Sequence, residues 1–348
     1  MSAQDKTLDQ YHNLMQMNAA SHVIRAGRQL GLLSELREGQ RTREQLRQAL
    51  KLDEQPLALI LDALVAIGIV EQYQEDYALS RAAHLLCQYD DDLGDSRWQK
   101  LAEHASAETN RQTHDDQPQF DYLAATQWIH TPAAIQAAEI LNVGPGVGEA
   151  DGSGAGRGSE ALHSSETPLR ILDLGCGSAV WSCAMAHRDP QAIVTAVDLP
   201  GSLDAARNTA DSIGLSDRVE WVEAEPHQAD LPQSTFDLGI LAQRVSNLGD
   251  ADARQLIERT INSVKPGGRL AVIDLFRGPT RPNFAEAIEA LRLQLETRGG
   301  YMRTLEEIQQ LLGETGLTDV QFAFIADSKV NLGIAVGTRP EKWLRLPA

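Results

Sequence analysis

The stretch RILDLGCGSAVWS, residues 170–182, decides the fold of this chain. Its apolar run at 171–174 is broken only by Asp173, which is typical of a buried parallel strand. The run stops at GCG, residues 175–177, where two glycines permit a tight turn and let the backbone approach a ligand closely. The residues after the turn have helical character, so a helix would present its free N–H groups and its positive dipole end to that ligand.

A second predicted strand, 192–197, ends in Asp198, which follows Gly177 after one helix and one strand. In a doubly wound fold, an acidic residue at the tip of the second strand hydrogen-bonds the ribose hydroxyls of an adenosine ligand. A solvated turn aspartate is the alternative interpretation. The order of strand, glycine turn, helix, strand and acid, with GCG in place of GxGxxG, resembles the class I S-adenosylmethionine (SAM) methyltransferases.

Strand and helix patterns alternate from there to the end of the chain, as expected for an α/β domain. Strands are predicted at 218–223, 236–241, 269–275, 320–325 and 332–336, and helices at 203–213, 250–264, 285–298 and 304–312. The strand 236–241 should lie beside the first strand, across the switch point where ligands bind. The KPGG turn at 265–268 is a recognisable mark of SAM methyltransferases. The resemblance implies a Rossmann-like seven-stranded methyltransferase domain over 169–340, with the last pair of strands returning antiparallel.

The first 90 residues have a different pattern, with three predicted helices followed by a small hairpin. The helices are expected at 8–33, at 42–50 with Thr42 as N-cap and Gln45 completing a capping box, and from Asp53 to Gly68. The run LALILDALVAIG at 57–68 is apolar nearly all round, which predicts burial on most sides. Two strand-like pieces, 69–73 and 77–80, complete a winged helix.

The strings GLLSEL, TREQLRQAL, LDALVAIGIVEQ and YALSRAAHLL, within residues 27–86, resemble the N-terminal dimerisation domain of plant and bacterial small-molecule O-methyltransferases. The resemblance implies a homodimer formed through residues 1–90. Winged helices often bind DNA, but residues 1–100 contain 11 Lys plus Arg and 15 Asp plus Glu, a net charge of 11 − 15 = −4. A DNA reader needs a basic face. The formal charge of −18 for the whole chain also argues against nucleic acid and anionic membranes.

Length and cysteine usage favour an intracellular protein with two domains. A chain of 348 residues is long enough for two domains with sizeable cores. Cys87, Cys176 and Cys183 have neither CxxC nor metal-ligand spacing, and an odd number does not suit a disulfide framework. The opening segment MSAQDKTLDQYHNLM lacks the features of a signal peptide, and no apolar run is long enough for a membrane span. A cytoplasmic location without a metal or a membrane partner is predicted.

Residues 91–141 are expected to connect the two domains through helices at 97–111 and 120–141, with Pro132 starting a new turn. In the family that the chain resembles, such helices line the substrate cavity. The resemblance therefore implies cavity roles for Phe120, Tyr122, Trp128 and His130. Core and hinge roles are equally open for these side chains. The Gly/Ser-rich segment 142–168 is predicted to be a flexible linker, in which His163 is a solvated residue.

The catalytic segment of the family is altered in this chain. Small-molecule O-methyltransferases carry a His-Asp-Trp sequence just after the fourth strand, and here the segment reads VSNLGD, so Ser246 stands at the position of the histidine. Of the two acidic residues that flank the histidine in many members, Asp274 fills the first position and Met302 replaces the second. The lysine that typically contacts the cofactor is Ala242 here, with Gln243 beside it.

The cofactor positions match the family better than the catalytic ones do. Asp198 is expected on the ribose of SAM, and Glu225 near the adenine, where family members have an aspartate. The implied cofactor-binding residues are Asp173, Gly175, Gly177, Asp198, Leu199, Glu225 and Gln243.

Three functions remain open on the sequence. The first is SAM-dependent methylation of a small molecule, with O-methylation favoured over N- or C-transfer and a non-standard or absent base. Asp274 is the first candidate for that base, followed by His227 and Tyr301. The second is a SAM-binding enzyme of the same fold that performs a hydroxylation or a rearrangement. The third is a non-catalytic SAM-binding regulatory protein.

Overall fold

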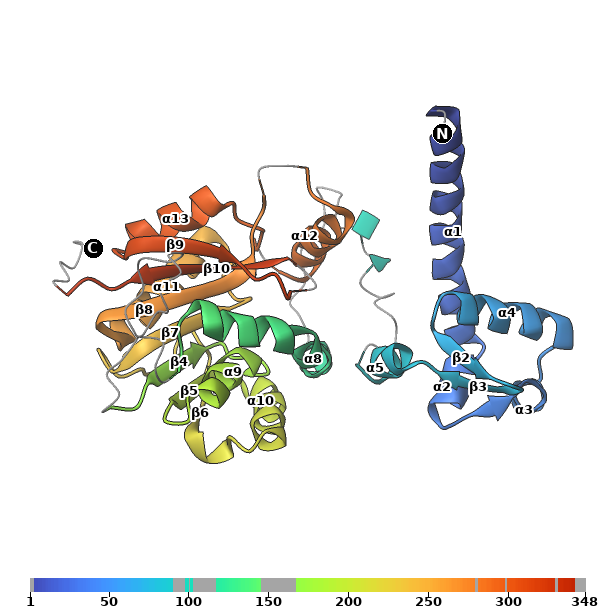
Figure 1. Cartoon of the computed structure of the whole chain (residues 1–348), viewed down its shortest axis with the longest axis horizontal. Coiled ribbons are helices and arrows are strands. Elements are labelled where there is room, and N and C mark those ends of the chain that lie inside the picture. The colour runs from blue at the N-terminus through green and yellow to red at the C-terminus, as the bar shows by residue number, and fades with distance from the viewer. Residues whose placement is uncertain are drawn as a thin grey trace, which may run out of the picture. The chain divides into compact units, whose positions relative to one another are not determined.

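The computed structural model describes residues 3–89, 98–99, 101–102, 117–144, 167–278, 281–297, 299–328 and 331–341. It divides into two compact units, Met1–Gln99 and Lys100–Ala348, which are blue to teal and green to red in Figure 1. The acidic segment 90–95, most of the helix expected at 97–111 and most of the linker expected at 142–168 lie outside the described residues.

The first unit consists of helices around a small antiparallel sheet with the strand order β1-β3-β2. Its elements are α1 (Ala3–Gln29), α2 (Leu32–Arg37), β1 (Arg41–Thr42), α3 (Arg43–Leu50), α4 (Glu54–Ala66), β2 (Val70–Tyr73), β3 (Asp76–Leu79) and α5 (Arg81–Tyr89). Gly31, with φ of 80°, separates α1 from α2. The predicted capping box is confirmed, because Thr42 Oγ1 accepts from Gln45 N at 3.2 Å and Gln45 Oε1 accepts from Thr42 N at 2.8 Å.

The predicted burial of α4 on most sides is wrong for a single chain. Only Leu57, Leu61 and Leu64 of this helix are buried, and the Leu59 side chain is 62% exposed. The reason is that α4 covers one side of a small core, and the apolar residues on its other faces contact nothing in the described part of this unit that buries them.

The second unit contains a seven-stranded sheet with the order β6-β5-β4-β7-β8-β10-β9. The strands are β4 (Arg170–Leu174), β5 (Ile193–Asp198), β6 (Val219–Glu223), β7 (Phe236–Ala242), β8 (Val264–Leu275), β9 (Thr318–Phe324) and β10 (Leu332–Thr338). Strand β4 lies between β5 and β7 and is parallel to both, so the predicted switch point is confirmed. Strand β10 is antiparallel to β8 and to β9, so β9 again runs in the direction of β8.

Helices cover both faces of this sheet (Figure 1). They are α8 (Gln117–Ile140), α9 (Val180–Arg188), α10 (Pro200–Ser212), α11 (Asp250–Ser263), α12 (Phe284–Glu296) and α13 (Leu305–Glu314), with a short 3-10 helix at Ser216–Arg218. Ile171 packs in the core shared with α8, α9 and α10, and its neighbour Leu172 packs in the core shared with α11 and α13. Successive strand residues therefore alternate between two buried faces, which explains the continuous apolar run of β4.

Two local expectations are corrected. Helix α8 runs through Pro132 without a new start, because Ala133, Ala134 and Ala137 behind it are buried in the core shared with α9, and this packing outweighs one lost hydrogen bond. Strand β8 begins at Val264 and includes the KPGG residues, rather than starting at Arg269. The KPGG residues interrupt the regular pairing of β7 with β8: Phe236 pairs with Val264 and Leu238 with Arg269, and the register shifts between these two pairs.

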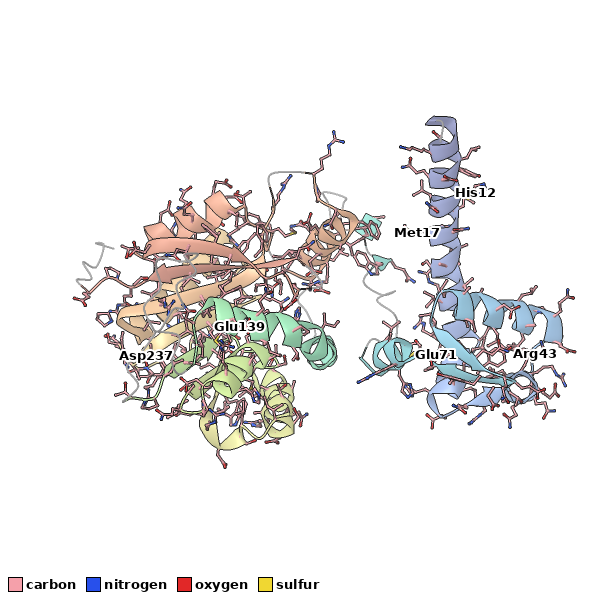
Figure 2. All side chains as sticks on the ribbon, in the orientation of Figure 1. His12, Met17, Arg43, Glu71, Glu139 and Asp237 are labelled. Atoms are coloured by element: carbon pink, nitrogen blue, oxygen red, sulfur yellow. The ribbon has the colours of Figure 1, made fainter. Side chains whose placement is uncertain are left out.

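Ion pairs and hydrogen bonds tie the amino ends of the central strands together. Asp237, labelled in Figure 2, accepts from Arg170 N at 2.9 Å and from Lys265 Nζ at 2.6 Å, so β4 and the start of β8 are joined to β7. The lysine of KPGG thus has a structural partner. No helix in the described part of the chain is long and apolar enough to cross a membrane.

Candidate functional site

The carboxyl ends of β4 to β8 lie along one edge of the sheet, because these five strands are parallel neighbours. Every residue predicted to hold the cofactor lies near the carboxyl end of one of these strands or directly after that end. The edge therefore collects Asp173, Gly175 and Gly177 from β4, Asp198 and Leu199 from β5, Glu225 after β6, and Gln243 after β7. Ligands of doubly wound folds bind at this edge, next to the switch point.

The glycine turn is held by the end of β5. Gly175 N donates to the carbonyl of Val197 at 2.8 Å, and Cys176 N donates to the same carbonyl at 3.2 Å. Gly175 has a φ of 76°, which only glycine adopts without strain. Gly177 N donates to Asp198 Oδ2 at 2.9 Å, while Asp198 Oδ1 accepts from Leu199 N at 2.8 Å. The Asp198 carboxylate therefore fixes the turn and the start of α10, and each oxygen keeps a second lone pair for a ligand.

Asp173 is a fully buried carboxyl group beneath this turn. Its Oδ2 accepts from the Ser182 hydroxyl at 2.5 Å, and its Oδ1 is buried with no hydrogen-bond partner among the residues that the structure describes. Burial raises the pKa of Asp173 to about 7, against the lowering effect of the Ser182 hydrogen bond. A buried acid with an unused oxygen is ready to accept a donor from a ligand.

Arg244 is part of this site and was not identified from the sequence. A Cβ atom added at Gly175 would lie 2.5 Å from Arg244 Nε and 3.0 Å from its Cδ, so the arginine side chain lies directly over the glycine turn. Burial raises the pKa of Asp173 and has the largest effect on it. The positive charge of Arg244 lowers that pKa, with a much smaller effect. The only signal in the sequence was its place beside Gln243, which follows the strand at the switch point.

The other cofactor candidates are half-buried at the same edge. Glu225 lies in the turn after β6, where its carbonyl accepts from Gln228 N and Ala229 N. Gln243 has a φ of 53°, and its N–H donates to the carbonyl of Ile273 at 2.7 Å, which extends the pairing of β7 with β8 by one hydrogen bond. His227, one of the base candidates, follows Glu225 in the same turn and is half-buried.

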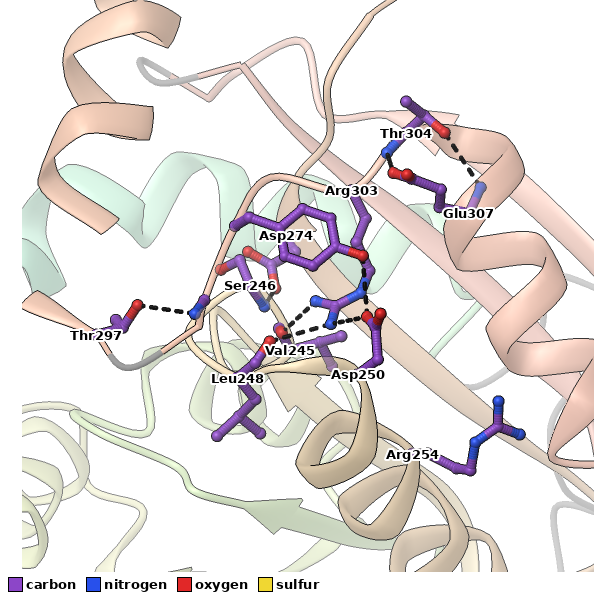
Figure 3. Close-up of polar contacts among 12 residues, drawn as sticks. Val245, Ser246, Leu248, Asp250, Arg254, Asp274, Thr297, Arg303, Thr304 and Glu307 are labelled. Atoms are coloured by element: carbon purple, nitrogen blue, oxygen red, sulfur yellow. Dashed lines mark hydrogen bonds and ion pairs between the residues drawn. The ribbon is translucent and has the colours of Figure 1, made fainter. Parts of the chain in front are cut away.

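Ser246 and Asp274 form a buried pair on the β7–β8 side of the site (Figure 3). Asp274 Oδ2 accepts from Ser246 N at 2.8 Å, and its Oδ1 accepts from Leu275 N at 2.9 Å. Burial raises the pKa of Asp274, while hydrogen bonds from Ser246 and Leu275 lower it. Met302 is 9% exposed and packs in the apolar core, so its position supplies no charge.

The cavity candidates are only partly described. His130 is buried on α8, with its ring centroid 5.8 Å from that of Trp181 on α9, and burial lowers the pKa of His130 to about 4. The backbones of Phe120, Tyr122 and Trp128 belong to α8, but their side chains lie outside the described residues. Across the described ranges, no cluster of three His, Cys, Asp or Glu side chains is arranged to hold a metal ion.

Residues 171–268, which contain the glycine turn, Asp198, Gln243 and Ser246, match the profile of the methyltransferase domain family. This part of the chain is similar to a methyltransferase domain. The match begins in β4 and ends at the KPGG sequence, so it covers the switch point and the carboxyl ends of β4, β5, β6 and β7.

Relatives with known activities align with the chain over different lengths. Aclacinomycin 10-hydroxylase RdmB of Streptomyces purpurascens is 34% identical over 149 residues, or 42% of this chain and 39% of the hydroxylase. The chain thus spans less than half the length of that relative. The mitomycin biosynthesis 6-O-methyltransferase of Streptomyces lavendulae is 24% identical over 313 residues, which are 88% of each chain.

Solved structures share the fold of the whole chain. Human N-acetylserotonin methyltransferase in complex with SAM matches with a TM-score of 0.68 and 18% identity, over 98% of this chain and 99% of the human one. At this identity the likeness shows the fold. The predicted architecture, a helical N-terminal region followed by a Rossmann-like domain with a mostly parallel seven-stranded sheet, is therefore confirmed.

Proposed function

We propose that this protein is a SAM-dependent methyltransferase that acts on a small molecule, with O-methylation as the favoured reaction. The observation that carries the proposal is the link between Asp198 and Gly177 at the switch point of a methyltransferase domain. An acidic residue there serves the ribose, and a glycine turn lets a ligand come close to the backbone. The long alignment with a mitomycin 6-O-methyltransferase supports methyl transfer to oxygen.

The residues at the carboxyl edge fit SAM in shape and charge. The glycine turn leaves no room for a side chain, and the free oxygen of Asp173 suits an ammonium donor. We propose that Asp173, Gly175, Gly177, Asp198, Leu199, Glu225 and Gln243 hold the cofactor. Arg244 joins them as a cation over the turn that suits a carboxylate. When bound, SAM supplies a methyl group activated by its sulfonium charge.

The protein itself has to orient the acceptor and, for a hydroxyl acceptor, to take up a proton. Orientation alone accounts for a large part of the rate of a bimolecular reaction. We propose Asp274 and Ser246 as the residues on the acceptor side, since they lie where the family has an acid and its histidine. The raised pKa of Asp274 moves its carboxylate toward the range of a general base.

A labelling experiment tests the function. The protein is incubated with SAM carrying a labelled methyl group and with a small-molecule extract, and S-adenosylhomocysteine and labelled products are measured. We expect both to appear together, and neither without the extract. Oxygen incorporation without label transfer would instead point to the chemistry named for the hydroxylase relative. Binding of SAM with no product in any extract would leave the regulatory alternative.

We further propose that residues 1–90 form a winged-helix dimerisation domain, followed by a helical connector at 91–141, a linker at 142–168 and the catalytic domain at 169–340. Helix α1 supports the dimer. Its residues 6–19 are all exposed, and Figure 2 shows side chains such as His12 and Met17 on a part of the helix without packed neighbours in the described part of this unit. An isolated helical segment of about 14 residues, the length of this exposed part, is marginal in water.

The cysteines bear on the compartment. Cys87, Cys176 and Cys183 are buried thiols, which suit a reducing cytoplasm.

Light scattering tests the dimer. At tens of micromolar the protein is expected at twice the mass of one chain, because Leu8, Tyr11, Leu14, Met15 and Met17 are each more than half exposed and form an apolar surface that a second copy would cover. The double variant Leu14→Glu, Met17→Glu should shift the mass to that of one chain. Gln16→Glu on the same helix is the matched control and should remain dimeric. A wild-type protein at the mass of one chain would rule the dimer out.

A further inference from the structure

Arg303 is buried beside the loop that carries Ser246. Its side chain is 3% exposed, and it donates through Nη1 to the carbonyl of Val245 at 2.6 Å and through Nη2 to the carbonyl of Leu248 at 3.0 Å. Nη2 also donates to Asp250 Oδ1 at 2.8 Å (Figure 3). One guanidinium thus joins the start and the end of the loop 245–249 to the first residue of α11.

The arginine is itself held in place by its neighbours. The Tyr301 ring lies 4.5 Å from the guanidinium carbon, and the Tyr301 hydroxyl donates to the same Asp250 oxygen at 2.9 Å. The Arg303 carbonyl accepts from Arg277 N at 2.9 Å, just beyond the end of β8. Because the cation contacts an aromatic face and a carboxylate together, its position is defined on two sides.

The loop has little internal support of its own. Asn247 N donates to the Arg244 carbonyl at 3.2 Å, and Leu248 N donates to the Val245 carbonyl at 3.3 Å. These two main-chain hydrogen bonds lie at or just beyond the long end of the usual range, and the Asn247 side chain adds one bond, from Nδ2 to the Gln243 carbonyl at 2.9 Å. Asp274 holds Ser246 N from the side of the sheet. On the other side the chain packs so closely that a Cβ at Gly300 would lie 2.6 Å from the carbonyl oxygen of Ser246.

We infer that Arg303 is a positioning residue, which fixes the loop 245–249 and thereby presents Ser246 at the carboxyl edge of the sheet. The inference rests on the proposed function only in assigning this loop to the acceptor side. Guanidinium geometry matters because two carbonyls, one carboxylate and one ring are contacted from a single planar group with five donors. Lysine has three donors around one atom and cannot span the same partners.

The test replaces Arg303 with methionine and with lysine and follows amide hydrogen exchange at residues 246–249. We expect exchange in both variants to be at least about tenfold faster, since the loop loses charged hydrogen bonds. S-adenosylhomocysteine affinity by calorimetry should stay within about twofold, because none of the described contacts of Arg303 is with a proposed cofactor residue. Methyl transfer to the extract should lose at least about tenfold in kcat with an unchanged KM for SAM.

Arg339→Lys is the matched control. Arg339 is also a buried arginine that donates to main-chain carbonyls, those of Ile261 and Asn262 among them, but it lies at the amino edge of the sheet. Its replacement should lower the thermal midpoint and leave both loop exchange and methyl transfer as in the wild type. Tyr301→Phe removes only the hydroxyl bond to Asp250, and should raise loop exchange about twofold to tenfold if the Arg303 variants do not fold.

The outcomes separate the two proposals. Unchanged loop exchange in Arg303→Met, or wild-type exchange and transfer in Arg303→Lys, would overturn the positioning role. A wild-type protein that binds no S-adenosylhomocysteine would end the proposed function, while faster loop exchange in the same variants would still support the role of Arg303 in the loop.

Discussion

Replacing Asp198 with alanine is expected to weaken the binding of S-adenosylhomocysteine by about tenfold to a hundredfold. A charged hydrogen bond to a ribose hydroxyl is worth about 1.5–3 kcal/mol, and this carboxylate is positioned for it at the tip of β5. The change also removes the acceptor of Gly177 N, so the turn beneath the ligand loosens. Isothermal titration calorimetry measures the affinity directly.

Asp204→Ala is the control for this variant, because Asp204 is exposed on α10 and pairs with Arg207 at 3.0 Å. It removes the same charge a short way further along the chain and should leave the affinity unchanged. If Asp198→Ala binds S-adenosylhomocysteine as the wild type does, the assignment of the ribose site is wrong.

The second large effect is a change in how stability depends on pH when Asp173 is replaced by asparagine. Burial raises the pKa of Asp173 from its ordinary 3.8 to about 7. The folded protein therefore keeps this proton between about pH 4 and pH 7, where the unfolded chain has released it. Over that interval the contribution of Asp173 to the free energy of unfolding falls as the pH rises, by about 4 kcal/mol at most, and it levels off above pH 7. The lowered pKa of His130 acts in the opposite direction between about pH 4 and pH 6.5, so the effect of Asp173 is read from the difference between the wild type and the variant.

Asparagine has the same shape and keeps an oxygen for the Ser182 hydroxyl, but it cannot ionise. The variant should unfold at a similar temperature to the wild type at pH 5 and at a higher temperature at pH 8, as measured by calorimetric melting. Its affinities for SAM and for S-adenosylhomocysteine should both fall, because both ligands carry the ammonium group that the Asp173 oxygen is proposed to accept from. Asp204→Asn should show neither effect. A difference in melting temperature between the variant and the wild type that is the same at pH 5 and at pH 8 would contradict the raised pKa.

The sequence was sufficient for features that depend on neighbouring residues. The alternation of Ile171 and Leu172 between two cores, the capping box at Thr42 and the glycine turn after β4 all follow from local geometry and the hydrophobic period. Because parallel strands share one edge for their carboxyl ends, the position of each cofactor candidate along the chain was enough to bring them together. Glu225 and Gln243 were named from the resemblance to the methyltransferases, and the structure puts both at this edge.

The sequence could not show which apolar faces are covered. The run at 57–68 is apolar all round, yet Leu57 is buried and Leu59 is exposed within the chain, since burial depends on what packs against each face. Pro132 is a second case. Its ring disfavours a helix locally, but the packing of the following alanines carries α8 through it.

Contacts between residues far apart in sequence were decided only by the tertiary structure. Arg244 covers Gly175, Asp274 accepts from Ser246 N, and Arg303 reaches the carbonyl of Val245 from a distant part of the chain. The side chains of arginine and aspartate have the same local preferences at an exposed position as at these buried ones. The direction in which they point is set by the carbonyls, amides and charges that the folded sheet brings beside them, and no pattern of neighbouring residues records those partners.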